Sequence, residues 1–271
     1  MQVNGSAQLA ARSPARREAA LLLIAAAGAW AATVAIARGM AGMTGTMGLG
    51  LVAFVPVWTL MMAAMMLPSV TPTATLYART IPGAGAPGSG AAGRRAAGRR
   101  AARITGLVVG YLGVWAAAGL PAYGLAWLAG WLTGWHPGAA HIAAVAVFAV
   151  AGAYQLSRLK DRCLARCRSP LGLLLHYGSY RGRFRDLRVG AHHGGYCLSC
   201  CWALMVILIA VGVMNVAAMV GLAALVLIEK TWTWGPAAGR LAGTAVLALA
   251  VATIWFPWLA PGLHAAPAMM S

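Results

Sequence analysis

The sequence predicts an all-α fold, a polytopic transmembrane helical bundle of about six spans, within a range of about five to seven. Hydrophobic residues make up 61% of the 271-residue chain and charged residues only 9%, whereas soluble domains carry about 25% charged residues. The mean hydropathy of +0.74 agrees with this class. Apolar runs of about eighteen or more residues recur, each long enough to cross a hydrocarbon core about 30 Å thick. Residues 19–258 are therefore expected to form one transmembrane domain.

The first two spans follow a basic N-terminal segment, residues 1–18, which is expected to be cytoplasmic. Residues 19–37 form the first span. This apolar region is longer than the roughly 7–15 residues of a signal peptide, so we predict an uncleaved helix. A short loop at 38–48 leads to a second span at 49–67, which can continue as helix beyond Pro68.

The middle of the chain alternates between an arginine-rich loop and apolar runs. Residues 79–103 are rich in Gly, Ala and Arg and contain no acid, a composition typical of disorder. The run at 104–132 is long for one straight crossing, and Pro121 is expected to kink or divide it. The fourth span is predicted to leave the apolar region near Leu156 and to continue as helix over 141–169, until Pro170 stops it.

The C-terminal part holds the remaining spans. Residues 171–188 mix aromatic, leucine and arginine side chains, as in segments that lie in the membrane interface. The apolar run at 197–228 predicts either one long tilted helix or two short helices broken near 212–215. The last span is expected at 241–258, and residues 259–271 form a tail.

The basic residues indicate the orientation. The chain has 21 Lys and Arg residues and a net charge of +17, and 18 of the 21 lie in residues 1–18, 79–103 and 158–188. The positive-inside rule places the N-terminus and both loops, the second extended to the Cys-flanked stretch 158–196, in the cytoplasm. We expect a multi-pass protein of the bacterial cytoplasmic membrane whose basic face contacts anionic lipids. A nucleic-acid partner is not expected, because no recognition module accompanies the charge.

All five cysteines lie in one 39-residue stretch. Cys163 and Cys167 are four residues apart and share a helix face, and the other three stand at i, i+3 and i+4 at the predicted start of the next span. A helix N-terminus favours the thiolate, which is the form that binds soft metals. The alternative is that small thiols pack as hydrophobic side chains. The candidate thiol and imidazole ligands are Cys163, Cys167, Cys197, Cys200, Cys201, His192 and His193.

Methionines give a second signal for a soft metal. Two i,i+4 pairs lie near the predicted cytoplasmic end of the second span, and another methionine follows the cysteines. Thioethers suit Cu(I) and are poor ligands for zinc, although methionine in a bundle can also be simple packing. The candidate thioether ligands are Met61, Met62, Met65, Met66 and Met205. Met40, Met43 and Met47 in the outer loop also fit capture of a soft metal.

Enzyme chemistry has little support in the sequence. The chain has four acidic residues and no Walker loop, GxSxG or HExxH motif. Of the acids, Glu229 follows an apolar run and is either an interfacial anchor or a coupling-ion carboxylate. Gln155 and Asn215 are expected to be satisfied by hydrogen bonds between helices. The question of an enzyme stays open, with a non-enzymatic role preferred.

Three sequence blocks and two short motifs resemble a known family. They are WTLMMAAMMLP (58–68), YQLSRLKDRCLARCRSP (154–170) and GYCLSCCWALM (195–205), then GVMN (212–215) and EK (229–230). Together they resemble the bacterial family of predicted metal-binding integral membrane proteins, a domain of unknown function, over roughly residues 49–245. The resemblance implies a membrane protein that binds a metal ion, and it implies no particular substrate.

These observations favour an inner-membrane protein that binds a soft transition metal through clustered Cys and Met, in metal handling or transport. Copper(I) is the preferred metal and zinc the second choice. A membrane thiol–disulfide oxidoreductase is one alternative, because Cys197 and Cys200 form a CxxC motif. A structural or assembly factor of a membrane complex, with the thiols as packing, is the other.

Overall fold

The computed structural model describes residues 5–40, 43–79, 91–169, 172, 177–178 and 180–264. In these residues the regular secondary structure consists of helices alone, without strands, which confirms the predicted all-α class. The helices are α1 (Gly5–Gly39), α2 (Leu51–Arg79), α3 (Ala91–Trp135), α4 (Pro137–Gln155), α5 (Arg158–Arg168), α7 (Arg185–Val211), α8 (Val216–Thr231) and α9 (Gly235–Trp255), followed by the 3₁₀ turns η1 (Pro257–Leu259) and η2 (Pro261–Leu263).

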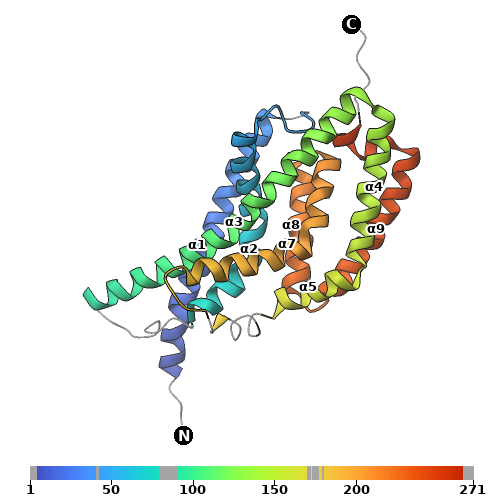
Figure 1. Cartoon of the computed structure of the whole chain (residues 1–271). Coiled ribbons are helices and arrows are strands. Elements are labelled where there is room, and N and C mark those ends of the chain that lie inside the picture. The colour runs from blue at the N-terminus through green and yellow to red at the C-terminus, as the bar shows by residue number, and fades with distance from the viewer. Residues whose placement is uncertain are drawn as a thin grey trace.

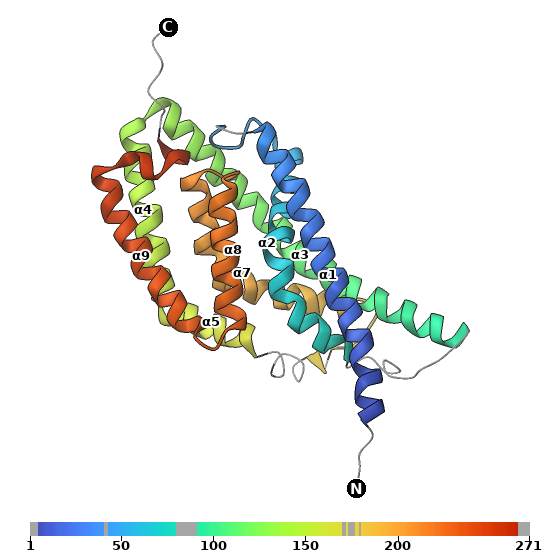
Figure 2. The ribbon, with the colours of Figure 1, turned by 180° about the vertical axis from the view of Figure 1, so that it is seen from behind.

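The helices form one elongated bundle. Helices α1, α2 and α3 lie on one side and the α4–α9 pair on the other, with α7 and α8 between them (Figure 1; Figure 2 shows the reverse side). Six of the described helices, α1, α2, α3, α4, α7 and α9, are long and apolar enough to cross a membrane. Helix α8 has only 16 residues and is not among these six, although it runs back along α7. The six helices agree with the predicted number of about six spans.

The outer surface of the bundle is apolar, and its exposed tryptophans gather at the helix ends. Trp232 and Trp234 precede α9 and are 58% and 73% exposed, while Trp255 at its other end is 66% exposed. Helix α9 has 21 residues, or about 32 Å at 1.5 Å per residue. Such aromatic belts at both ends of a span of this length are typical of membrane helices.

Helices α3 and α7 are packed through glycines. Gly106 and Gly110 on α3 lie against residues 186–191 of α7, and Gly190 and Gly194 on α7 lie against residues 107–114 of α3. A Cβ atom added at Gly190 would lie 1.9 Å from the carbonyl oxygen of Leu107, and one at Gly110 would lie 2.1 Å from that of Leu187. Small residues at i and i+4 on both partners allow the two backbones to touch. This contact fixes the helix that carries three of the cysteines against the centre of the bundle.

Three boundaries differ from those expected from the sequence. Residues 91–103, expected in a disordered loop, are helical, whereas residues 80–90 lie outside the described part of the chain. Helix α3 continues through Pro121 without division. The expected continuous helix over 141–169 is instead two helices, because Ser157 caps α5 by accepting a hydrogen bond from the Lys160 amide at 3.2 Å.

The run at 197–228 forms two helices, which decides between the two alternatives. Gly212 has a φ of +96°, a conformation that favours glycine. Asn215 then caps α8 by accepting a hydrogen bond from the Ala218 amide at 3.1 Å. The side chain that was expected to bridge helices therefore caps its own helix. The turn sends α8 back along α7, so the end of α8 returns to the level of the cysteines.

Candidate metal site

Four of the five cysteines meet inside the bundle. Cys197, Cys200 and Cys201 on α7 are at most 1% exposed, and Cys167 on α5 is 8% exposed. The Sγ of Cys200 lies 3.8 Å from the Sγ of Cys167 and 3.3 Å from that of Cys201. We call Cys167, Cys197, Cys200 and Cys201 the thiol cluster. Because α5 and α7 both contribute to it, the two Cys-containing sequence blocks form one site.

Cys197 lies where four helices meet. Its Sγ accepts a hydrogen bond from the Lys230 Nζ on α8 at 2.8 Å and is 2.9 Å from the Tyr111 hydroxyl on α3. The Lys230 Nζ also lies 3.4 Å from the Ser69 Oγ on α2. Pairing with a sulfur anion reduces the cost of taking an ammonium group out of water. Lys230 was noted from the sequence only as part of the EK motif, and Tyr111 was not predicted as part of the site.

Glu229 holds the end of α8 in this position. Both of its carboxylate oxygens accept hydrogen bonds from the Lys160 Nζ, at 2.7 and 2.9 Å, and both side chains are 1% exposed. Gln155 on α4 donates a further hydrogen bond, as expected for a bond between helices. A Cβ atom at Gly239 on α9 would lie 2.8 Å from the Glu229 Oε1. Glu229 is therefore a buried anchor between helices. In the sequence, the adjacent charges of Glu229 and Lys230 at the end of an apolar run were the feature that pointed to this position.

The two candidate histidines lie in different surroundings. His193 is 4% exposed, stands one turn before Cys197 and stacks on the Tyr111 ring with the centroids 5.9 Å apart. Its Nδ1 has no hydrogen-bond partner in the described part of the chain. The Nδ1 of His192 lies 3.2 Å from the Tyr177 hydroxyl, and its ring packs edge-on against Tyr196. Of the two, His193 is the imidazole beside Cys197.

The candidate methionines share the apolar core with the thiol cluster. All five are at most 2% exposed. The Met66 carbonyl accepts a hydrogen bond from the Ser69 hydroxyl, which in turn lies beside Lys230. The α2 turn that carries Met66 is therefore connected to Cys197 through Ser69 and Lys230. The five candidate methionines are Met61, Met62, Met65, Met66 and Met205.

Cys163 stands at the edge of the site. It shares the α5 face with Cys167, as the spacing predicts, but it is only half-buried. Helix α7 begins at Arg185, so Cys197 lies in mid-helix rather than at the start of a span. The prediction that a helix N-terminus stabilises the thiolate form of these cysteines is therefore wrong, because the glycine-rich stretch before Cys197 is itself helical and packs on α3. Lys230 supplies the positive charge instead.

The cluster has the chemistry of a soft-metal site without a finished coordination geometry. Two thiolates that share a zinc ion about 2.3 Å from each sulfur, at a near-tetrahedral angle, hold their sulfurs about 3.8 Å apart. The Cys167–Cys200 distance of 3.8 Å fits this value. Among residues 5–264, where described, no three Cys, His, Asp or Glu side chains are already arranged around one point. For these side chains to surround a metal ion, some of them would have to rotate, and Cys197 would have to give up its contact with Lys230.

The comparisons with known proteins identify the family. Searches of curated proteins and of solved structures gave no match. A family model described as "PpoB2: Copper chaperone" matches residues 55–253. The match includes the methionine pairs of α2, all five cysteines, and Glu229 and Lys230, and it covers more than half of the chain. The protein belongs to the PpoB2 copper chaperone family.

Proposed function

We propose that this protein is a membrane-embedded copper(I) chaperone of the bacterial inner membrane, which binds the ion at the thiol cluster and passes it on. The observation that carries the proposal is the meeting of four buried sulfurs from α5 and α7 in one place, at distances of 3.3 and 3.8 Å for two of the pairs. Family membership supports copper as the metal. The basic N-terminus and loops support a cytoplasmic position for the cluster.

The ligand set favours Cu(I) over zinc. Cu(I) accepts thiolate and thioether sulfur together, whereas zinc sites in proteins use thiolate, imidazole and carboxylate, almost always four at a time. Here the thiols are accompanied by five buried methionines. The buried Glu229 carboxylate is already bound to Lys160 and is not free to act as a ligand. Zinc remains the second choice.

Lys230 gives the cluster a charge balance that a chaperone can use. Without metal, its ammonium group is the cation next to the Cys197 sulfur. Cu(I) also carries a single positive charge, so it can pair with the Cys197 sulfur in place of the ammonium. When a second thiol of the cluster binds the ion it releases its proton, so the charge of the site, Lys230 included, stays the same in loading and in release.

The geometry does not favour the oxidoreductase alternative. Cys200 and Cys201 are in contact, but they are consecutive residues of a helix, and the roughly 3.8 Å between consecutive Cα atoms is shorter than disulfides normally span. Thiol–disulfide exchange also needs access for an attacking thiolate. The sulfurs of Cys197 and Cys200, which form the CxxC motif, and that of Cys201 belong to side chains that are at most 1% exposed.

Copper analysis of the purified full-length protein tests the proposal. The double variant Cys200→Ser/Cys201→Ser is expected to lose bound copper while it elutes from size exclusion like the parent. Ser199→Ala is the matched control, because Ser199 lies on the same turn but is exposed, and it should retain the copper. Equal copper content in the double variant and the parent would remove the thiol cluster as the binding site. An oxidised thiol fraction trapped from growing cells would instead support the oxidoreductase.

A further inference from the structure

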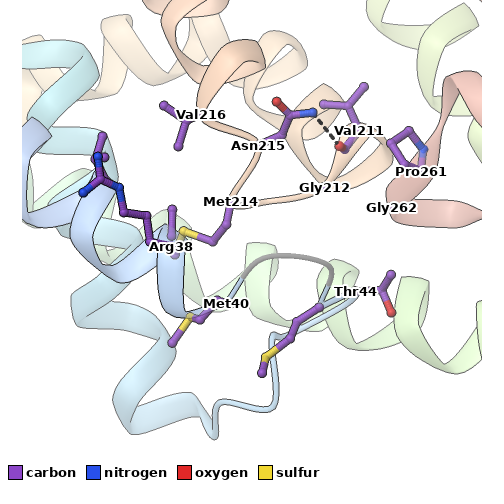
Figure 3. Close-up of a pocket in the computed structure, with 13 residues that line it drawn as sticks. Arg38, Met40, Thr44, Val211, Gly212, Met214, Asn215, Val216, Pro261 and Gly262 are labelled. Atoms are coloured by element: carbon purple, nitrogen blue, oxygen red, sulfur yellow. Dashed lines mark hydrogen bonds between the residues drawn. The ribbon is translucent and has the colours of Figure 1, made fainter.

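A second group of sulfur ligands lines a cavity at the opposite end of α7 and α8. The cavity has a volume of about 570 Å³ and lies beneath the turn that joins the two helices. Met40 and Met43 lie in the connection between α1 and α2, and Met214 is in the α7–α8 turn, so the three thioethers come from two separate parts of the chain. Figure 3 shows Met40 and Met214 on the α1 side of the cavity, with Pro261 and Gly262 on the other side.

The remaining polar groups of the cavity leave sulfur as the available ligand. The Asn215 amide is used at both ends, since its Nδ2 donates to the Val211 carbonyl at 3.2 Å and its Oδ1 accepts from the Ala218 amide. The described residues that line the cavity include one charged side chain, Arg38, one hydroxyl, that of Thr44, and no carboxylate. Hard cations such as Mg²⁺ and Ca²⁺ need several oxygen ligands, most of them charged, and these side chains offer no charged oxygen. Thioethers select Cu(I).

Helices α7 and α8 extend from the cavity to the thiol cluster. Val211 at the end of α7 is ten residues beyond Cys201, which corresponds to about 15 Å along the helix. Two more buried methionines lie between the two sites. Met205 is one turn beyond Cys201, and Met219 is one turn into α8; they are 2% and 0% exposed.

We propose that the cavity formed by Met40, Met43 and Met214 is a second, weaker Cu(I) site, at which copper enters or leaves the bundle on the side opposite the thiol cluster. The inference takes copper as the cargo from the proposed function but does not depend on the cysteines. Thioethers are neutral, and Arg38 adds positive charge at the wall, so the site binds Cu(I) less strongly than thiolates do. Met43 is 52% exposed, which lets an arriving ion reach the first ligand from solution.

Silver(I), a soft monovalent ion that is stable in air, is the probe for this site. Full-length protein in detergent is titrated with Ag(I) by calorimetry, first the parent and then Met40→Leu/Met43→Leu/Met214→Leu. The weak binding phase should disappear in the triple variant, and the tight phase should remain. Leucine conserves the side-chain volume and is expected to leave the fold intact. Met47→Leu is the matched control, because Met47 lies in the same loop, is 3% exposed and does not line the cavity.

Two further variants make the outcome decisive. Arg38→Gln removes the positive charge from the wall and should strengthen the weak phase, whereas a cavity without a metal role predicts no change. Met43→Leu alone changes an exposed side chain, so it tests the site if the triple variant does not fold. An unchanged weak phase in the methionine variants overturns the inference. Loss of the tight phase in Cys200→Ser/Cys201→Ser is a separate result, so the proposed function and this inference can fail independently.

Discussion

The buried ion pair between Lys160 and Glu229 makes a quantitative prediction about stability. Both side chains are 1% exposed, and removal of one partner from such a pair costs about 3–5 kcal/mol because the other charge stays buried and unpaired. Lys160→Met should fall at the lower end, about 3 kcal/mol, because Gln155 still donates a hydrogen bond to Glu229. At about 2–4 °C per kcal/mol for a chain of this size, Tm should fall by about 6–12 °C.

The double variant Lys160→Met/Glu229→Gln removes both charges and should recover most of the loss. The assay is the fraction of protein that elutes as a single species after heating in detergent. Arg240→Met is the control, since Arg240 pairs with Asp161 at 3.6 Å with the two side chains 67% and 41% exposed, and a pair of this kind contributes at most about 1 kcal/mol. Equal losses in Lys160→Met and Arg240→Met, or no recovery in the double variant, would refute the reasoning.

Three other predictions follow from the packing and the sulfur positions. Gly190→Ala should prevent accumulation of folded protein, because the added Cβ would overlap the backbone of α3. Gly195→Ala is the control and should be neutral or slightly stabilising, because a Cβ there meets nothing within 4 Å. Expression levels and elution profiles compare the two variants. A maleimide reagent should label native metal-free protein quickly at Cys163 alone and all five cysteines after denaturation, and mass spectrometry counts the labels. Met61→Leu/Met65→Leu should keep equilibrium copper binding but lose copper-dependent growth tolerance if these thioethers conduct the ion, and a wild-type phenotype would leave them as packing.

The transmembrane class was predictable because it depends on composition and length alone. The runs at 19–37 and 49–67 are long and apolar, and the structure has α1 and α2 there. The helix at 91–103 was missed because its Gly, Ala and Arg composition resembles that of disordered segments. Ala and Arg are nevertheless good helix formers, and here they extend α3 beyond the apolar run. Local composition could not show that the same helix continues.

The residues of the candidate site could be chosen from the sequence, whereas their arrangement in space could not. The spacing placed Cys163 and Cys167 on one face, and the structure agrees. The start of α7 was missed because the apolar run begins only at Cys197, although the glycines before it, Gly190 and Gly194, allow contact with α3. The contact of Lys230 with Cys197 depends on α8 folding back along α7. That reversal arises at Gly212, and no pattern within either helix specifies the partner that its far end meets.

Glu229 and Lys230 are neighbours in sequence, yet their side chains bind different parts of the bundle. Glu229 is bound to α4 and α5, and Lys230 to α2 and α7. A planar peptide unit with Cα atoms about 3.8 Å apart joins the two. A shift of α4 and α5 relative to α7 is therefore transmitted through one rigid unit to the ammonium group beside the Cys197 sulfur. The last turn of α8 thus links the packing of α4 and α5 to the surroundings of the Cys197 sulfur.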